Sequence, residues 1–287
     1  MKRITLIALT LVLALSLAMF AGCGSPTPPT PAAPDEPVAP EAPEIRTLVI
    51  GATPVPHTEI LEFIQDKMLE EGIELQIRTF TDFVQPNLAT QAGDIDANYF
   101  QHVPYMNSFN ETHGTEMVAL FAVHFEPLGL YKARTRSLEE LADGAIIAIP
   151  NDATNGARAL QLLEAAGLIT LRDGAGIMAT RMDVIENPLN IDIRELEAAQ
   201  LPHILPDVDM AVINGNFALQ AGLELEADSV AAEEADSLSA ITYANYIVVR
   251  AGNEDDERVQ ILINVINSDA VREFINTRYA GRVVPVF

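Results

Sequence analysis

Uncharged polar side chains follow several predicted strands of this chain, and one arginine lies close behind such a strand. Asn155 and Arg158 come after the apolar run AIIAIP (145–150), Asn214 follows the run MAVI, and Asn245 lies within TYANYIVV. Ligands of α/β folds bind beyond the carboxyl ends of the strands. Taken alone, each asparagine is more typical of a helix cap or a turn. Taken together, they indicate a polar site at one sheet edge.

Arg158 raises an electrostatic question. The stretch AIIAIPNDATNGARALQLLEAAG (145–167) predicts a buried strand, a polar turn and then a helix, with Arg158 in the first turn of the helix and with Leu160 and Leu163 in the core. A helix N-terminus carries about half a positive charge, so a cation is unfavourable there. An anion beside Arg158 would make the placement favourable.

Residue patterns for catalysis or metal binding are sparse. The sequence contains no G-x-S-x-G or H-E-x-x-H motif and no phosphate-binding glycine loop. No two histidines have the spacing that places metal ligands on one helix. We therefore expect no enzymatic activity, and the sequence does not support a metal site or a cofactor. The five histidines are His57, His102, His113, His124 and His203.

An aromatic cluster lies in the segment DANYFQHVPY (96–105). It contains Tyr99, Phe100 and Tyr105, with His102 among them. One interpretation is a set of core aromatics with a single hydrogen-bonded histidine. The other is the aromatic wall of an apolar pocket, with His102 as its polar group. The pattern alone does not separate the two.

The N-terminus is a targeting segment. A positive start is followed by an uncharged apolar run and then by small residues, which predicts a signal peptide over 1–22. A short membrane anchor is the alternative. The only cysteine, Cys23, has no disulfide partner, and Phe20-Ala21-Gly22-Cys23 resembles a bacterial lipoprotein signal, although Phe20 stands where leucine is usual. The resemblance implies cleavage before Cys23 and its acylation, for example with palmitate. The alternative is a free thiol.

Residues 23–45 combine Cys23 with a segment rich in proline, alanine and acidic residues. This composition predicts an extended tether between a lipid and a globular body, rather than a disordered end without a role. The whole chain of 287 residues has a formal net charge of −24. Because phosphate binding requires clustered lysine and arginine, we expect no nucleic-acid partner.

Strands alternate with helices in the rest of the chain. This alternation predicts βαβ units, a largely parallel sheet and two α/β lobes. The expected strands are 47–52, 73–80, 117–125, 145–149, 191–196, 209–214 and 242–250. The expected helices are 57–72, 85–93, 137–144, 256–269 and 270–279, besides the helix that contains Arg158.

Several segments resemble the NlpA-type lipoprotein family, the methionine-binding proteins of an ABC importer. The most specific are FQHVPY, PNDATNGAR and AVINGN, and further matches run in order between residues 48 and 250. The resemblance implies an α/β, two-lobed type II periplasmic-binding-protein fold with two interlobe crossovers. We place the crossings near 129–134 and 239–245. Lobe 1 is then 46–130 plus 243–287, and lobe 2 is 131–242.

The resemblance also implies roles for residues that match the family's motifs. Arg158 would bind the ligand carboxylate together with the free amides of the first helical turn, with help from Asn155. The missing anion would therefore come from the ligand. Asn214 and Asn245 would hold its α-amino and carboxylate groups. Residues lining the side-chain pocket would be Phe83, Phe100, His102 and Tyr105. Phe83 and Ala153 depart from the tyrosine and proline of many relatives, and Glu126 faces either the ligand or the hinge.

The function that the resemblance implies is capture of L-methionine and its delivery to an ABC permease and its ATPase. The protein would be lipid-anchored to the cell membrane, on the extracytoplasmic face, through Cys23. A methionine-containing dipeptide or another amino acid is the alternative ligand. An enzyme acting on amino acids and a surface adhesin with a vestigial pocket are the alternative classes.

Overall fold

The computed structural model describes residues 45–234 and 238–287. Residues 43–287 form one compact unit. The predicted signal peptide (1–22), Cys23 and all but the last residue of the predicted tether (23–45) lie outside the described residues. Within the described ranges, no helix combines the length and the apolar character needed to cross a membrane.

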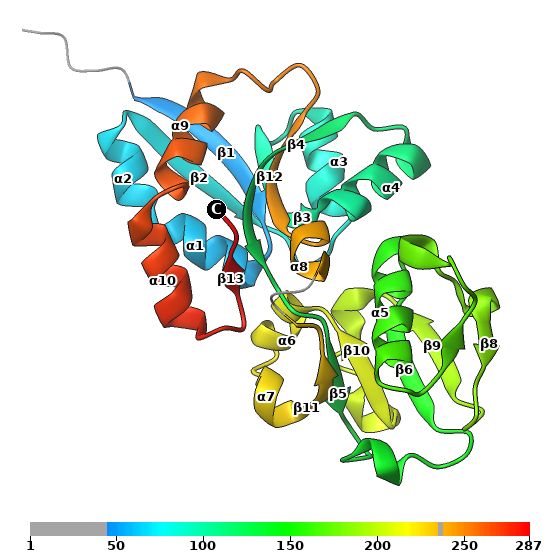
Figure 1. Cartoon of the computed structure of the whole chain (residues 1–287). Helices are drawn as coiled ribbons and strands as arrows, with labels where there is room; N and C mark the ends of the chain where they lie inside the picture. The colour runs from blue at the N-terminus through cyan, green and yellow to red at the C-terminus, as the bar shows by residue number, and fades with distance from the viewer. Residues whose placement is uncertain (1–44, 235–237) are drawn as a thin grey trace, which may run out of the picture. The chain divides into compact units, whose positions relative to one another are not determined.

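The first sheet has six strands in the order β13-β4-β12-β3-β1-β2 (Figure 1). The strands are β1 (Arg46–Ala52), β2 (Ile73–Thr79), β3 (Ala97–His102), β4 (Met117–Phe125), β12 (Asn245–Arg250) and β13 (Val284–Pro285). β1 pairs in parallel with β2 and β3, whereas β12 runs antiparallel to both β3 and β4. The sheet is therefore mixed.

Helices cover both faces of the first sheet. One face buries apolar side chains such as Leu48, Ile50 and Leu262. The elements on this face are η1 (Pro54–Thr58), α1 (Glu59–Phe63), α2 (Gln65–Glu70), α9 (Glu257–Ile266) and α10 (Asp269–Tyr279). The other face carries α3 (Gln85–Ala92) and α4 (Val103–His113). Glycines with positive φ end the two helices, Gly93 after α3 and Gly114 after α4.

The second sheet has five strands in the order β11-β5-β10-β6-β9. They are β5 (Gly129–Lys132), β6 (Ile146–Pro150), β9 (Asp192–Leu196), β10 (Met210–Ile213) and β11 (Ser229–Ala232). α5 (Ala153–Ala165) packs on one face through residues such as Leu160 and Leu163, as expected from the sequence. α6 (Gly215–Gln220) packs on the other face through Phe217.

Smaller elements complete the second part. Two further short strands, β7 (Thr170–Leu171) and β8 (Val184–Glu186), pair with each other. The short helices are η2 (Leu138–Glu140), η3 (Gly176–Met178), η4 (Arg181–Asp183), η5 (Ala198–Gln200), η6 (Leu205–Asp207) and α7 (Leu225–Asp228). The helix α8 (Leu238–Thr242) directly precedes β12 of the first sheet.

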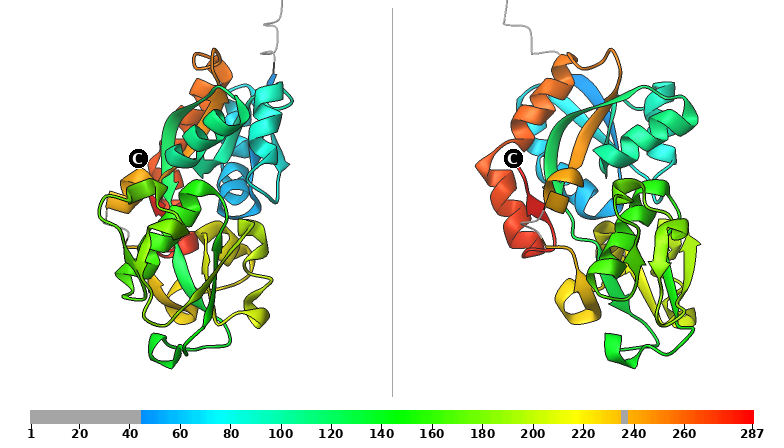
Figure 2. Two further views of the ribbon diagram at one scale, coloured as in Figure 1. Left: turned by 90° about the vertical axis from the view of Figure 1, so that its right-hand side faces the viewer. Right: turned by 45° about the vertical axis from the view of Figure 1, so that its right-hand side comes forward.

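The chain passes between the two sheets from β4 to β5, through residues 126–128, and returns between β11 and β12. Figure 2 shows β4 leading out of the first sheet toward this passage, and α4 beside α5. β5 and β11 lie together at one side of the second sheet, since β11 pairs with β5. The lobe boundaries drawn from the sequence remain a prediction.

Some expectations about the elements were wrong. The sheets are mixed rather than largely parallel, because β5 and β12 each enter their sheet after a passage from the other sheet and run antiparallel to their neighbours, without the helical crossover that keeps strands parallel. The helix expected over 57–72 is interrupted at Ile64, whose ψ of −2° departs from regular α-helix geometry. The helix expected over 137–144 is only the single turn η2, because Leu141 is already extended. Residues 242–244 precede the strand expected to include them.

Candidate functional site

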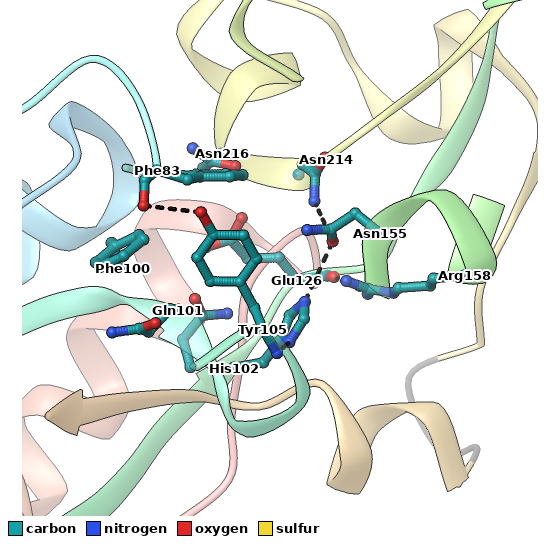
Figure 3. A pocket seen from close by; sticks show the side chains of 12 residues that line it. Phe83, Phe100, Gln101, His102, Tyr105, Glu126, Asn155, Arg158, Asn214 and Asn216 are labelled. Atoms are coloured by element: carbon teal, nitrogen blue, oxygen red, sulfur yellow. Dashed lines mark hydrogen bonds between the residues drawn. The ribbon is translucent and has the colours of Figure 1, made fainter. Parts of the chain in front are cut away.

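One pocket brings together residues from both parts of the fold (Figure 3). It is lined by all eight residues for which the sequence predicted a binding role, namely Phe83, Phe100, His102, Tyr105, Asn155, Arg158, Asn214 and Asn245. The remaining lining residues are Gln101, Glu126, Gly215 and Asn216.

Aromatic rings form one wall of the pocket. The ring centroid of Phe83 lies 4.8 Å from that of Phe217, 5.8 Å from that of Phe100 and 5.9 Å from that of Tyr105. The Tyr105 hydroxyl donates a hydrogen bond of 2.9 Å to the carbonyl oxygen of Phe83, which fixes the loop before α3 against α4. Tyr99 of the same cluster is fully buried in the sheet core, so the segment 96–105 supplies both core and wall.

His102 is held as a neutral imidazole. Its Nδ1 accepts a hydrogen bond of 3.1 Å from the backbone N–H of Tyr105 and so caps α4. Nε2 therefore carries the proton and donates to Asn155 Oδ1 at 3.2 Å. Burial, together with the positive charge of Arg158, lowers the pKa of His102 to about 3. His102 therefore offers the pocket a polarised ring without a charge.

The Asn155 amide connects the two sheets. Its Oδ1 accepts from both His102 and Asn214, the latter through Nδ2 at 2.9 Å. Its Nδ2 donates to the Asp152 carboxylate at 3.0 and 3.1 Å. An amide oxygen accepts two hydrogen bonds and an amide nitrogen donates two. Both acceptor positions of Oδ1 are therefore used within the protein, and Nδ2 is bonded to the Asp152 carboxylate, so Asn155 positions its neighbours.

The N-terminus of α5 is already occupied. Asp152 is the N-cap residue, and its carboxylate accepts hydrogen bonds from the backbone N–H groups of Thr154 and Asn155. The expectation that the first-turn amides are free for a ligand was therefore wrong. Arg158 is the sixth residue of α5 and so lies in the second turn, where the dipole effect has weakened.

The anion beside Arg158 belongs to this chain. The guanidinium Nε and Nη2 donate to the two carboxylate oxygens of Glu233 at 2.7 and 2.5 Å, and Nη2 also donates to the Glu126 carbonyl at 2.9 Å. The guanidinium carbon lies 4.4 Å from the ring centroid of Tyr243. The expectation that only a ligand supplies this anion was wrong. Nη1, however, bonds to none of the residues that the structure describes, and Arg158 lines the pocket.

Several polar atoms at the site have no partner among the described residues. Oδ1 of Asn214 and Nδ2 of Asn216 are both buried without a hydrogen bond, and both residues line the pocket. The Tyr243 hydroxyl is buried without one as well. An unsatisfied buried polar group costs about 1–3 kcal/mol. The pocket therefore offers a free acceptor, Asn214 Oδ1, and free donors, Asn216 Nδ2 and Arg158 Nη1. A ligand that carries both a donor and an acceptor would satisfy them.

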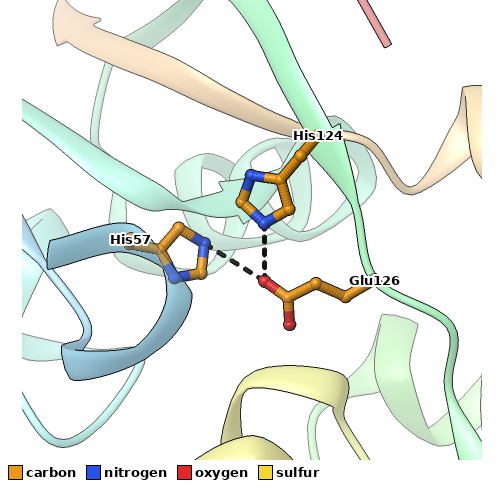
Figure 4. A group of neighbouring side chains, drawn as sticks. All are labelled: His57, His124 and Glu126. Carbon is orange, nitrogen blue, oxygen red and sulfur yellow. Dashed lines mark hydrogen bonds and ion pairs between the residues drawn. The ribbon is translucent and has the colours of Figure 1, made fainter. Parts of the chain in front are cut away.

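Glu126 lies at the start of the first passage between the sheets, close to His57 and His124 (Figure 4). Its Oε1 lies 2.7 Å from His124 Nε2 and 3.4 Å from His57 Nε2. Its carboxylate also accepts from the backbone N–H of Asn216 in α6, and burial raises its pKa. Asn245 Oδ1 lies 3.2 Å from His57 Nε2, so this network reaches the pocket.

His57, His124 and Glu126 also form the one group in the described part of the chain whose side chains could converge on a metal ion. Their other ring nitrogens are already bonded, His57 Nδ1 to Thr53 and His124 Nδ1 to the Tyr99 hydroxyl. Burial lowers the pKa of both histidines to about 3. Neutral imidazoles that donate to a carboxylate satisfy every group of this cluster. The geometry therefore describes a hydrogen-bond network between the sheets.

Two residues of the site had no binding role in the sequence analysis. Asn216 follows the same strand as Asn214 and belongs to the same set of post-strand polar residues, but only Asn214 was given a role. Glu233 lies in the acidic stretch AAEEAD, 75 residues from Arg158, and no local pattern marks it. The sequence left open whether Glu126 faces the ligand or the hinge. In the structure Glu126 lies at the passage between the sheets, and it also lines the pocket.

Comparisons with known proteins agree with this arrangement. Residues 48–287 match the family described as NlpA lipoprotein. The D-methionine-binding lipoprotein MetQ of Salmonella typhimurium is 40% identical over 240 residues, which cover 83% of this chain and 86% of the relative. A nutrient-binding protein from Burkholderia cenocepacia, solved bound to methionine, superposes with a TM-score of 0.79 at 41% identity, covering 84% of this chain and all of that one. A periplasmic substrate-binding protein of an ABC transporter from Coxiella burnetii superposes with a TM-score of 0.78 at 38% identity, covering 83% and 100%.

Proposed function

We propose, given that the chain belongs to the NlpA lipoprotein family, that it is the substrate-binding protein of an ABC importer and captures methionine in the pocket of Figure 3. The observation that carries the proposal is the pairing of unused polar groups with an aromatic wall in one small pocket. Such a pocket suits a zwitterion with an apolar side chain. The name of the Salmonella relative and the methionine-bound Burkholderia structure support the same ligand.

The unused groups suggest how the ligand is held. Arg158 Nη1 donates to the ligand carboxylate, and Asn214 Oδ1 accepts from its α-ammonium group. Asn216 Nδ2 is a further donor within the pocket. Asn245 completes the polar side, as the resemblance implied. Asn155 acts through His102 and Asn214, because its own groups are already bonded.

The ligand side chain lies against the aromatic wall. Phe83, Phe100 and Tyr105 supply rings to which a thioether sulfur can make contacts worth about 0.3–1.5 kcal/mol each. Norleucine has the same length but lacks the sulfur. We therefore expect it to bind up to about tenfold more weakly than methionine.

The bound ligand is released unchanged. The pocket lies between the two sheets, so closure of the lobes around the ligand would exclude water and present a changed surface to the transporter. Delivery to an ABC permease with its ATPase follows as the cellular role. We propose lobe 1 as 46–130 plus 243–287 and lobe 2 as 131–242, with movement about the two segments that connect the sheets.

The protein is held at the membrane by lipid. The lipoprotein-like signal ending at Cys23 supports acylation of that residue and an extracytoplasmic position on the cell membrane. Acylation requires the Cys23 sulfur. Cys23→Ser should therefore move the protein from the membrane fraction to the soluble fraction, and an unchanged distribution would contradict the anchor.

Calorimetric titration tests the ligand. Protein that has been unfolded, dialysed and refolded is titrated with L-methionine, D-methionine, norleucine and glycyl-methionine. We expect L-methionine to bind, and D-methionine is included because the Salmonella relative is named for it. Asn214→Ala should weaken binding at least about tenfold, whereas Asn276→Ala, exposed on α10, should leave it unchanged. Heat with the dipeptide alone would overturn the choice of methionine.

A further inference from the structure

We propose that Glu233 is a positioning residue: it fixes the orientation of Arg158 for the ligand carboxylate and makes the pocket select ligands without net charge. The inference rests on the proposed function, since it concerns how the same pocket recognises a zwitterion. Neither the sequence motifs nor the family match assigns a role to Glu233.

The first support is the geometry of the ion pair. Glu233 accepts from Nε and Nη2 of Arg158 through both carboxylate oxygens, at 2.7 and 2.5 Å. The side chains of Arg158 and Glu233 are 4% and 9% exposed. A bidentate pair with a planar guanidinium fixes the plane and the rotation of that group. One edge of the guanidinium is therefore fixed, and Nη1 on the other edge, which bonds to none of the described residues, is left for the ligand.

The second support is the attachment of this pair to both connections between the sheets. The Leu128 N–H donates to Glu233 Oε2 at 2.9 Å, and the Glu233 N–H donates to the Leu128 carbonyl at 3.0 Å. Leu128 belongs to the first connection and Glu233 follows β11 on the second. Arg158 Nη2 also bonds to the carbonyl of Glu126 on the first connection. The orientation of Arg158 is thus set relative to the segments about which the lobes would move.

The third support is the balance of charge. Arg158 is the lone cationic side chain among the described residues that line the pocket, because His102 is neutral with a pKa of about 3. Glu233 compensates the charge of Arg158 at hydrogen-bond distance, and Glu126, the carboxyl group among the lining residues, adds no positive charge. A ligand with a carboxylate alone would bring a net negative charge to a buried, compensated site. A ligand that also carries an ammonium group would bring no net charge to the site.

The pocket therefore has two separable properties that depend on Glu233. Its hydrogen bonds orient Arg158, and its negative charge disfavours anions. Glu233→Gln keeps the size of the side chain and removes the charge. Glu233→Asp keeps the charge and shortens the side chain, which withdraws it from the guanidinium. The two variants test the two properties separately.

The test compares methionine with its α-hydroxy analogue, 2-hydroxy-4-(methylthio)butanoate. This analogue has the same shape and is an anion without an ammonium group. Both are titrated calorimetrically into refolded wild type, E233Q, E233D and the control E226Q, whose changed residue is exposed on α7. Far-UV circular dichroism melting confirms that each variant is folded.

We expect E233Q to bind methionine about tenfold more weakly than wild type. The ratio of its affinities for methionine and for the hydroxy acid should also be about tenfold smaller than the wild-type ratio. E233D should also bind methionine more weakly but keep the preference, and E226Q should match wild type. A merely structural role would not move the preference. The inference would be overturned if E233Q kept the wild-type affinity for methionine and the wild-type preference. If E233Q does not fold, wild-type affinity for methionine in E233D would overturn it instead. A wild type that does not bind methionine would instead overturn the proposed function.

Discussion

Replacement of Arg158 by methionine tests whether one guanidinium serves both the fold and the ligand. The Arg158–Glu233 pair is almost fully buried, with side-chain exposures of 4% and 9%. Arg158→Met leaves the Glu233 carboxylate in place without its partner. Removal of one member of a buried ion pair costs about 3–5 kcal/mol. We therefore expect R158M to lower the free energy of unfolding by about 3–5 kcal/mol at neutral pH.

The affinity of R158M for methionine should fall for a different reason. R158M removes Nη1, the donor proposed for the ligand carboxylate, so methionine affinity should fall at least about a hundredfold. The double variant R158M/E233Q no longer buries an unpaired charge, and the amide oxygen of the substituted side chain can still accept from the Leu128 N–H. The double variant should recover more than half of the lost stability while methionine binding stays weak.

The assays are urea unfolding, followed by far-UV circular dichroism because the chain has no tryptophan, and calorimetric titration. Arg172→Met is the matched control, since it breaks an ion pair with Asp183 in which the arginine is 62% exposed. Such an exposed pair contributes at most about 1 kcal/mol. The reasoning is refuted if R158M unfolds like wild type, or if the second substitution restores nothing.

Two further predictions concern pH and the contact between the sheets. Burial lowers the pKa values of His57, His102 and His124 to about 3, so between about pH 3 and 6.5 the unfolded chain binds more protons than the folded one. Stability should fall as the pH drops below about 6.5, by about 1 kcal/mol per histidine at pH 5.5, and the raised pKa of Glu126 offsets part of this loss. Equal unfolding free energies at pH 7.5 and 5.5 would contradict this predicted loss of stability. In Gly215→Ala, the added Cβ would lie 2.7 Å from Glu126 Cβ, closer than real contacts allow, so we expect a stability loss of about 1–3 kcal/mol and weaker methionine binding. Wild-type values in both assays would show that this contact relaxes freely.

The polar site could be predicted in part because two of its residues follow strands. Asn155 and Asn214 were placed near each other by that rule, whereas Asn245 is the first residue of β12 and was placed there by motif; the structure brings all three to one pocket. Their ligand-binding roles stay a prediction. The rule works because the carboxyl ends of neighbouring parallel strands lie at one sheet edge, whatever the details of packing.

The partner of Arg158 could not be predicted from the sequence. Glu233 is 75 residues away, and only the meeting of α5 with the end of β11 brings the two together. The occupied N-terminus of α5 is a different case. Asp152 immediately precedes the helix and is a preferred N-cap residue, so the sequence did carry a signal that the first-turn amides are taken.

The segment 96–105 was interpreted only as an aromatic cluster, although it is β3 followed by the start of α4. Pro104 stands in the first turn of α4, a position at which proline is common and which marks a helix start. The strand itself is buried along its whole length, so it lacks the alternation by which half-buried strands are recognised.

The most direct test of the central claim is a crystal structure of the refolded protein with free L-selenomethionine. The protein's own methionines contain sulfur, so an anomalous selenium peak locates the ligand side chain alone. The account predicts one peak in the pocket, against the rings of Phe83, Phe100 and Tyr105, with the ligand carboxylate at Nη1 of Arg158. A peak elsewhere, or a carboxylate bound away from Arg158, would contradict it.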